Sequence, residues 1–408
     1  MNEEQNIKQL PKDWKWVKVG EYVISVKGKK PKRVSNTKTK ECSIPYVNIK
    51  AFEKNIIDEY TDGVGCALCD DGDFLMVWDG SRSGYVGKAI KGALGSTLVK
   101  LNFPDMYNNY AFYFLQSKYL DINTRAKGVG IPHVDPNILW NYDLLIPPRL
   151  TQQAIISKIE ELFSELDKGI ENLRTAQQQL KTYRQSVLKW AFEGKLTNEN
   201  VKEGELPQEW KWVKLGDLME SVRNGYSKKP DEVGRYKILR ISSVRPNKVY
   251  VDEVRFLEKE IGIENSLAEN DLLFTRYNGS IDFVGVCGRV PKLNESLFYP
   301  DKLIRCRPKI KDWFHSAYID YAANSRLARQ FVLSKIKTTA GQTGISGSDI
   351  KEIPIPLPPT EEQNKIVQEI ESRLSVADKM EETITQSLQQ AEALRQSILK
   401  KAFEGKLI

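Results

Sequence analysis

Four side chains come closest to the spacing of a metal or nucleophilic centre, and none of them completes one. Cys66 and Cys69 form a Cys-x-x-Cys pair, as in zinc and redox sites, but the sequence supplies no second pair and no histidine cluster. His133 and His315 are the only histidines, and neither has a candidate partner near it in the sequence. A pair of strand cysteines is the better interpretation of Cys66 and Cys69, and histidine-based catalysis is not expected.

Phosphate and metal chemistry are also poorly represented. The stretch Gly84-Tyr85-Val86-Gly87-Lys88 lacks the spacing of a phosphate-binding loop, and no dinucleotide fingerprint follows a strand. Asp349-Ile350-Lys351 is the nearest match to a nuclease centre, yet such a match arises by chance in a chain with 28% charged residues. We therefore predict that the chain is not itself an enzyme and that it holds no metal or cofactor.

Basic and amide side chains, in contrast, recur at matching turns in the two halves of the chain. Lys and Arg suit DNA phosphates, and Arg, Asn and Gln can bind base edges in the major groove. Any one of these residues alone is better explained as a solvated surface residue, so the hypothesis depends on the recurrence. The candidates for DNA contact are Lys29, Lys30, Lys32, Arg33, Arg82, Tyr85, Arg125 and Lys127 in the first half, and Arg223, Lys228, Lys229, Arg276, Tyr277, Asn278, Lys335, Lys337 and Gln342 in the second.

The segments that must position these turns are duplicated. Residues 151–196 match residues 362–407 at an offset of 211, and both end in Ala-Phe-Glu-Gly-Lys-Leu. In the first copy apolar residues recur every seven positions from Ile159 to Val187, with an interleaved row that includes Tyr183 and Trp190. This pattern predicts two long helices that pair. One intramolecular antiparallel coiled coil is our first choice, and a coiled-coil homodimer is the second.

The second copy has the weaker heptad pattern, because its apolar residues are smaller. We therefore expect the two helices to need each other. Gly194 and Gly405 fall where a left-handed C-cap belongs, and at ~1.5 Å per residue each helix would be roughly 60 Å long. The heptad row of the second copy comprises Ile370, Ala377, Ile384, Ala391 and Ile398, with Met380 and Leu394 in the interleaved row.

The globular halves open with matching segments, Leu-Pro-x-x-Trp-Lys-Trp-Val-Lys, at residues 10–18 and 206–214. The offset here is 196, so the second half carries 15 more residues than the first. Short apolar runs bounded by Gly, Asn or Asp predict strands between these landmarks. We predict an α+β fold with pseudo-two-fold symmetry, in which two mixed α/β domains, 1–150 and 198–359, alternate with the long helices 151–197 and 360–408.

Composition is that of an ordinary globular chain. Lys and Arg number 61 against 54 Asp and Glu, a net charge of +7, which is a mild pointer to nucleic acid. Five cysteines, an odd number, suggest a reducing compartment. The first residues lack the apolar core of a signal peptide, and no run of ~18 apolar residues occurs. We expect a cytoplasmic protein without a membrane segment.

Two recognition domains that alternate with two similar long helices resemble the specificity subunit of Type I restriction–modification systems. The resemblance covers nearly the whole chain and rests on the duplicated AFEGKL helices, the Pro-Pro edges followed by Gln152-Gln153 and Glu362-Gln363, and the Leu-Pro-x-x-Trp openings. One departure is Thr151-Gln152-Gln153, where the common form resembles Glu362-Gln363. The resemblance implies that each domain reads one half of a split DNA target and that the helices set the spacer between the halves.

The resemblance also implies partners. Double-stranded DNA and two methylation subunits would bind this chain, with motor–nuclease subunits in the full complex. Those partners would carry S-adenosylmethionine, ATP and Mg, together with adenine-N6 methylation and ATP-dependent cleavage. Phe192 and Phe403, which occupy the same place in the two AFEGKL segments, are candidates for the subunit interface.

Two other classes of function remain open at this point. A self-contained methylase or nuclease would transfer methyl groups or cleave DNA without partners. A coiled-coil adaptor would touch no DNA, so its complex with a methylation subunit would show no preference for any duplex sequence.

Overall fold

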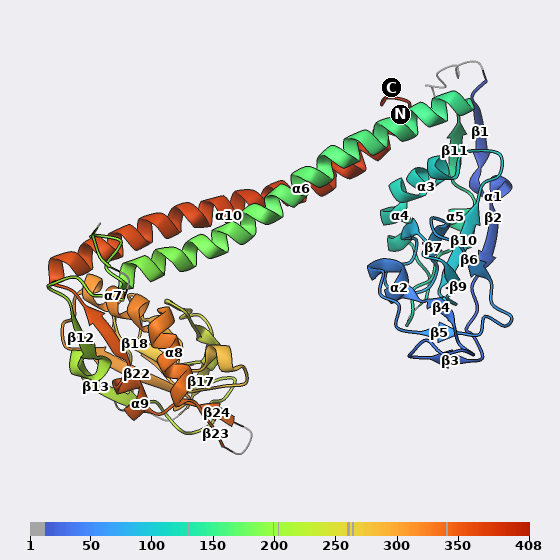
Figure 1. The fold of residues 1–408 in the computed structure, drawn as a ribbon. Helices are drawn as coiled ribbons and strands as arrows, with labels where there is room; N and C mark the ends of the chain where they lie inside the picture. Colours follow the sequence, from blue (N-terminus) through green and yellow to red (C-terminus); the bar gives the residue numbers. More distant parts are fainter. Residues whose placement is uncertain are drawn as a thin grey trace. The chain divides into compact units, whose positions relative to one another are not determined.

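The computed structural model divides the chain into two compact units, each built around one globular domain and parts of both long helices. It describes residues 13–408 except 129, 199, 203, 259–261, 263, 264, 340 and 341. Unit 1 contains the residues up to Arg174 together with Thr385–Ile408, and unit 2 is Thr175–Ile384. Figure 1 shows both units along the coloured chain.

The described residues of domain 1, in unit 1, form three sheets. Its central strands, β10 and β7, are buried because their sequences are nearly continuous apolar runs. A two-stranded ribbon pairs β1 (Lys15–Lys18) with β11 (Asp143–Ile146). The four-stranded sheet has the order β2 (Ile24–Lys27), β10 (Leu98–Asn102), β7 (Phe74–Val77), β8 (Val86–Lys88). The five-stranded sheet has the order β3 (Val34–Ser35), β5 (Tyr60–Thr61), β4 (Ile44–Val47), β9 (Gly92–Leu94), β6 (Leu68–Cys69).

The helices of domain 1 are short. The largest, α3, places its apolar face on the four-stranded sheet and on the start of the long helix, in one hydrophobic core. Their bounds are α1 (Val19–Tyr22), α2 (Ile49–Lys54), α3 (Asn108–Ser117), α4 (Tyr119–Thr124) and α5 (Pro136–Leu139).

Domain 2, in unit 2, repeats the ribbon and the four-stranded sheet of domain 1. Its four-stranded sheet runs β13 (Met219–Asn224), β22 (Leu303–Pro308), β18 (Leu272–Thr275), β20 (Cys287–Arg289), and its ribbon pairs β12 (Lys211–Lys214) with β25 (Pro354–Leu357). The remaining strands are β17 (Val254–Leu257), β14 (Tyr236–Leu239) and β21 (Leu297–Phe298) in one sheet, the pair β15 (Val244–Arg245) and β16 (Lys248–Val249), and β19 (Tyr277–Asn278), β24 (Gln342–Gly344) and β23 (Lys337–Thr339) in another.

Helices of domain 2 cover the matching face of its four-stranded sheet. The α-helices are α7 (Trp313–Ala323), α8 (Arg326–Lys335) and α9 (Gly347–Lys351), and short 3-10 helices lie at Leu215–Leu218, Ile241–Ser243 and Ile281–Phe283. The two domains therefore share the ribbon and the order of the four-stranded sheet, although little of their sequence matches and their other strands are arranged differently. The predicted pair of mixed α/β domains is confirmed.

Each long helix, α6 (Arg149–Phe192) and α10 (Thr360–Phe403), starts from its Pro-Pro edge in the same way. The backbone N–H groups of Gln152 and Gln363 each donate to the carbonyl of the proline four residues earlier, at 3.0 Å in both cases. Their buried side chains donate through Nε2 to the backbone carbonyls of the preceding prolines, Pro147 and Pro358, at 2.9 and 2.8 Å. Because proline already caps the first turn, α6 begins at Arg149, two residues before the predicted start.

The helix ends also differ from the predicted bounds of 197 and 408. Both helices stop at the phenylalanine of the AFEGKL segment, since the glycine two residues later takes a left-handed conformation, with φ of 77° at Gly194 and 69° at Gly405. The N–H of the following lysine then donates back to the carbonyl five residues earlier, at 2.9 Å in both copies. These are Schellman caps, as the position of the glycines predicts.

The two long helices run antiparallel within one chain. In unit 1, Asp167 of α6 pairs with Arg395 of α10, and Arg395 lies over the Phe163 ring at 4.4 Å. In unit 2, Arg184, further along α6, pairs with Asp378, which lies earlier in α10. A residue further along α6 therefore contacts a residue earlier in α10, which is the antiparallel pairing that we expected first.

The heptad rows are buried unequally. The row from Ile370 to Ile398, expected to be the weaker, is 8% exposed or less at all five positions. The interleaved rows are buried only at their first members, Ile155 and Ile366, which lie in the cores of the two units. Further along, the rows depart from the expected seam, because Tyr183, Trp190, Met380 and Leu394 are 38–51% exposed. A helix with a single neighbour has only one buried row, so the second row turns toward solvent.

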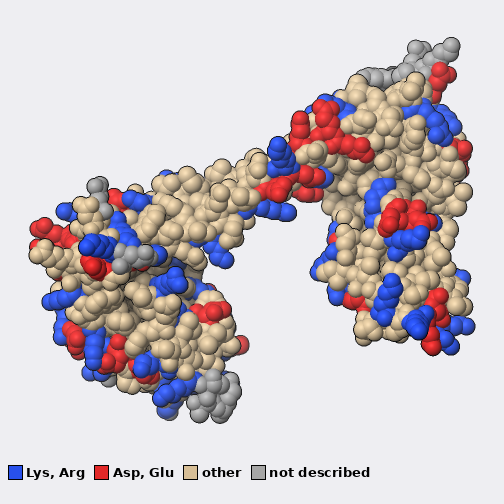
Figure 2. All heavy atoms as spheres, in the orientation of Figure 1, with Lys and Arg blue, Asp and Glu red and all other residues tan. Residues whose placement is uncertain are grey.

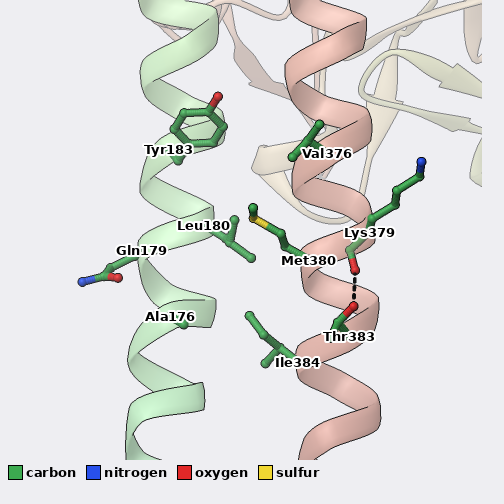
Figure 3. Close-up of a pocket in the computed structure, with 9 residues that line it drawn as sticks. All are labelled: Ala176, Gln179, Leu180, Tyr183, Val376, Lys379, Met380, Thr383 and Ile384. Atoms are coloured by element: carbon green, nitrogen blue, oxygen red, sulfur yellow. Dashed lines mark hydrogen bonds between the residues drawn. The ribbon is translucent and has the colours of Figure 1, made fainter.

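In unit 2 two of these side chains, Tyr183 and Met380, line an apolar groove of about 550 Å³ between the helices. Figure 3 shows Leu180 of α6 and Met380 of α10 pointing toward each other across it.

Candidate nucleic-acid interface

In unit 1 the basic turn after β2 crosses closely over the turn before β10. Gly28 donates its backbone N–H to the Leu98 carbonyl at 3.0 Å. A Cβ at Gly28 would lie 2.1 Å from the Gly95 carbonyl oxygen, so only glycine permits this approach. The exposed Lys29 and Lys30 follow directly, and the crossing therefore fixes where the basic turn begins.

The Gly-Ser turn between β7 and β8 joins the same cluster. Trp78 donates its backbone N–H to the Thr97 carbonyl at 2.8 Å, which ties this turn to the one before β10. Lys27, at the end of β2, pairs with Asp79 through Nζ and Oδ2 at 2.9 Å. The basic turn and the Gly-Ser turn are thus linked by both backbone and charge.

A loop after α4 completes the cluster in unit 1. Gly80 of the Gly-Ser turn donates its N–H to the Pro132 carbonyl at 2.8 Å. Lys127 and His133 exchange two backbone hydrogen bonds, at 2.9 and 2.7 Å, so the predicted Lys127 lies at the base of this loop. Four turns that are distant in sequence therefore meet at one end of the four-stranded sheet.

Unit 2 builds the same cluster from different residues. A Cβ at Gly225 would lie 2.2 Å from the Tyr299 carbonyl oxygen, which repeats the glycine crossing of unit 1. Arg276 donates its backbone N–H to the Lys302 carbonyl at 2.8 Å. β19, which holds Tyr277 and Asn278, pairs with β24 and through it with β23, which begins at Lys337. The matched turns of the sequence are therefore matched in space within each unit.

The predicted cations divide into two groups by their pairing. Arg82 pairs with Glu53 at 3.1 Å, Arg125 with Asp121 at 3.4 Å and Lys127 with Asp135 at 2.8 Å. The Lys127 ammonium, hydrogen-bonded to Asp135, lowers the pKa of that carboxyl below its ordinary value. In the described part of the chain no ion pair involves the exposed Lys29, Lys30, Lys32, Arg33, Arg223, Lys228, Lys229, Lys335 or Lys337.

Unpaired cations are the better phosphate ligands, because a phosphate would not have to displace a carboxylate. Figure 2 shows Lys and Arg mixed with Asp and Glu on the visible face, rather than gathered in one continuous basic patch. The turn clusters, and not the overall charge, therefore define the candidate interface.

The aromatic candidates have a structural role as well. Tyr85 is half-buried, with its ring edge-on to Phe52 at 6.0 Å and to Tyr119 at 5.9 Å, and the Arg82 guanidinium lies 3.9 Å above it. Tyr277 lies under Arg276 at 4.8 Å. Each of these arginines is held in place by an aromatic ring. The side chain of the remaining candidate, Gln342, lies outside the described residues.

Phe192 and Phe403 are placed in contacts within the chain. Phe403 packs edge-on against Tyr110 of α3 at 5.2 Å, and Phe192 packs against Tyr318 of α7 at 5.7 Å. Phe192 is only 2% exposed, so a partner could touch little of it. The AFEGKL repeat thus fastens the end of each long helix to the domain of its own unit.

Sequence reasoning missed two cations near these clusters. Lys302 is exposed in the turn before β22, next to Arg276, and Arg245 lies over the ring of Phe283 at 5.2 Å. Lys302 follows a Pro-Asp pair, and extending the comparison of matched turns to that pair would have found it. No sequence pattern marks Arg245, because domain 1 has helix α2 where domain 2 has the β15–β16 hairpin.

Among the residues that the structure describes, no group of three or more His, Cys, Asp or Glu is arranged to hold a metal. Cys69 lies buried in β6, and burial raises the pKa of its thiol to about 11. Over the same residues, no helix has both the length and the apolarity to cross a membrane.

Comparison with known proteins gives consistent matches. A family model described as the type I restriction modification DNA specificity domain matches residues 11–175 and 207–390. The EcoKI specificity subunit of Escherichia coli K12 is 40% identical over 311 residues, which cover 74% of this chain but only 66% of that protein. The MjaVIII specificity subunit of Methanocaldococcus jannaschii is 27% identical over 99% of this chain and 96% of its own length.

Two solved structures share the fold. One, from work on complex assembly and conformational transition of the type I R-M system, has a TM-score of 0.72 at 19% identity and covers 98% of this chain and 99% of its own. The HsdS subunit of Thermoanaerobacter tengcongensis has a TM-score of 0.54 at 19% identity, with 97% and 98% covered.

Proposed function

Because the chain belongs to the type I restriction–modification DNA specificity family, we propose that it is the subunit that reads a bipartite DNA target, with one half-site per domain. The observation that carries this proposal is the duplicated turn cluster. Both domains present basic and amide side chains at the same end of the same sheet, yet the side chains differ. A shared frame with different loops suits two half-sites of different sequence.

The antiparallel helix pair sets the spacer in this proposal. Each helix has 44 residues, which at ~1.5 Å per residue is about 66 Å. That length compares with roughly two turns of duplex at ~34–36 Å per turn. The spacer would then depend on the number of heptads and not on the turn clusters.

Catalysis belongs to partner subunits in this proposal. Two methylation subunits bind the chain, and motor–nuclease subunits join them in the cytoplasm. S-adenosylmethionine, ATP and Mg are held by those partners, which methylate adenine N6 and cleave DNA. The family match and the absence of a recognisable catalytic motif in the sequence support this division.

Binding of duplex DNA by the chain mixed with its cognate methylation subunit tests the proposal. We expect one split sequence to be bound at least ~10³-fold more tightly than unrelated duplex. A complex that binds all duplexes equally would instead support the adaptor function, and methyl transfer by the purified chain alone would support the enzyme function.

Exchanging one domain tests whether each domain recognises its own half-site. Replacing residues 21–145 with those of another recognition domain should change one half-site and leave the other unchanged. Methylation mapping across a genome gives both half-sites and the spacer in one measurement. A change in both halves would contradict the assignment of one half-site to each domain.

A further inference from the structure

The same exposed tryptophan occurs at the same place in both units. Trp16 lies in β1 and Trp212 in β12, each within the tetrapeptide Lys-Trp-Val-Lys. Their side chains are 55% and 51% exposed. Trp16 pairs with Leu145 of β11 and Trp212 with Pro356 of β25, in the same register of the same ribbon. The residue type, its position in the ribbon and its exposure are therefore the same in both units.

The fold is able to bury an indole in this segment. Trp210, two residues before Trp212, is 7% exposed, and its Nε1–H donates to the Glu362 carboxylate at 2.9 Å. In the part of the chain that the structure describes, the indole N–H groups of Trp16 and Trp212 have no hydrogen bond. An exposed indole leaves a large apolar surface in water, with a hydrogen-bond donor at its edge, and this is what a protein interface uses as an anchor.

The charges beside the two indoles favour a protein over DNA. The lysine two residues after each tryptophan is already paired, Lys18 with Asp143 at 2.6 Å and Lys214 with Glu352 at 2.7 Å. On the strand face that carries each indole the nearest lysine is thus neutralised. Lys15 and Lys211, one residue before the indoles, have no ion pair among the described residues but lie on the opposite face of the strand. An apolar centre with a polar rim is typical of protein interfaces, whereas phosphate binding needs unpaired lysine or arginine.

The duplication defines the occupant. Most surface side chains differ between the two domains, but this ribbon keeps one tetrapeptide in one geometry. A surface that is present twice suits a partner that binds twice. Resting on the proposed function, we propose that Trp16 and Trp212 are equivalent anchors, each seated in an apolar pocket of one copy of the methylation subunit.

Affinity and stoichiometry measured with the full-length chain and the purified cognate methylation subunit test this proposal. Wild-type chain should bind two copies. Trp16→Ala should weaken one copy on the order of 30-fold, Trp212→Ala the other copy by a similar factor, and the double variant both. Trp16→Phe, which keeps an aromatic ring, should lose less. Calorimetric titration gives the affinities, and light scattering gives the mass of each complex.

Ile24→Ala is the matched control, because Ile24 is 56% exposed in β2 of the same domain but has no exposed apolar counterpart in β13. It should bind both copies normally, and all variants should keep the wild-type melting temperature. If the double variant still binds two copies with unchanged affinity, the assignment of the tryptophans as anchors is overturned and the proposed function is not. Wild-type chain that binds no methylation subunit would overturn the proposed function as well. If the wild-type chain self-associates and the double variant does not, the indoles contact a second copy of this chain, and the proposal is overturned.

Discussion

Arg307 of β22 donates two hydrogen bonds to Asp271, the residue before β18, from Nε to Oδ1 at 2.8 Å and from a terminal nitrogen to Oδ2 at 2.7 Å. Asp271 is 1% exposed, and Asp271 Oδ2 also accepts the backbone N–H of Ala268 at 2.8 Å. Domain 1 has a looser version, in which Lys100 pairs with Asp73 at 3.0 Å and both side chains are about one-third exposed.

Asp271→Asn should therefore destabilise domain 2 more than Asp73→Asn destabilises domain 1. Removing one partner of a buried pair leaves the other charge uncompensated, at a cost of about 3 kcal/mol, whereas an exposed pair contributes about 0.5 kcal/mol. Scanning calorimetry of the full chain measures both transitions. Equal losses in the two domains would contradict the difference in burial.

The stability of domain 2 should depend on pH through Asp320. Asp320 is 2% exposed in α7, near Cys287, Asn324 and Arg289, and burial raises the pKa of its carboxyl to about 7. Since this pKa lies above the ordinary value of 3.8, the folded state holds the proton more tightly than the unfolded state. Stability is then full below about pH 4 and falls as pH rises toward 7, by at most about 1.4 kcal/mol per pH unit.

Thermal denaturation of wild-type chain and Asp320→Asn between pH 4 and 8 measures this effect. The variant keeps the shape of a neutral carboxyl and does not titrate. Its advantage over wild-type chain should grow with pH and level off above about 7. Parallel pH profiles for the two proteins would show that other groups set the dependence.

The unpaired cations of the basic turn should contribute more to DNA affinity than the paired cations of the loop after α4. Lys29→Ala with Lys30→Ala should weaken binding to all duplexes alike and reduce the salt dependence by about one ion for each phosphate that the variant no longer binds. Lys127→Ala should change it less, because Lys127 is paired with Asp135. Affinity measured across a range of salt concentrations distinguishes them.

Lys91→Ala is the control for this experiment, since Lys91 is exposed and pairs with Asp70 outside the cluster. It should leave the salt dependence unchanged. A weakening confined to one duplex sequence would mean that Lys29 or Lys30 reads bases and does not bind phosphates.

Gly28→Ala should disrupt the turn cluster of domain 1, because the new Cβ would lie 2.1 Å from a backbone oxygen that cannot move freely. We expect a loss of about 1–3 kcal/mol and weaker recognition of one half-site.

Gly169→Ala is the opposite case. Gly169 lies inside α6 with no other atom within 4 Å of the new Cβ, so alanine should stabilise the helix by about 0.5–1 kcal/mol. Calorimetry of the Gly28 and Gly169 variants shows whether each substitution lowers or raises the stability of the chain.

The sequence predicts the long helices and the duplication well, because a seven-residue period and a six-residue identity are local signals. It does not predict that Tyr183 and Met380 remain 38% and 51% exposed, since that depends on how many neighbours each helix has. The strand order is also beyond it, because β2 pairs with β10, which lies far along the chain. Arg245 could not have been found at all, as its place near Phe283 depends on a hairpin that only one domain has.

The surplus length of the second domain is divided among several connections. The offset between equivalent residues is 197 at Gly28 and Gly225, 198 at Asp73 and Asp271, 208 at Tyr110 and Tyr318, and 211 at the two clamping glutamines. Since the order of the four-stranded sheet and both clamps persist through these changes, the scaffold accommodates insertions at several separate points. Such a molecule can acquire a new sequence preference piecemeal, one connection at a time, without rebuilding the frame that its neighbours recognise.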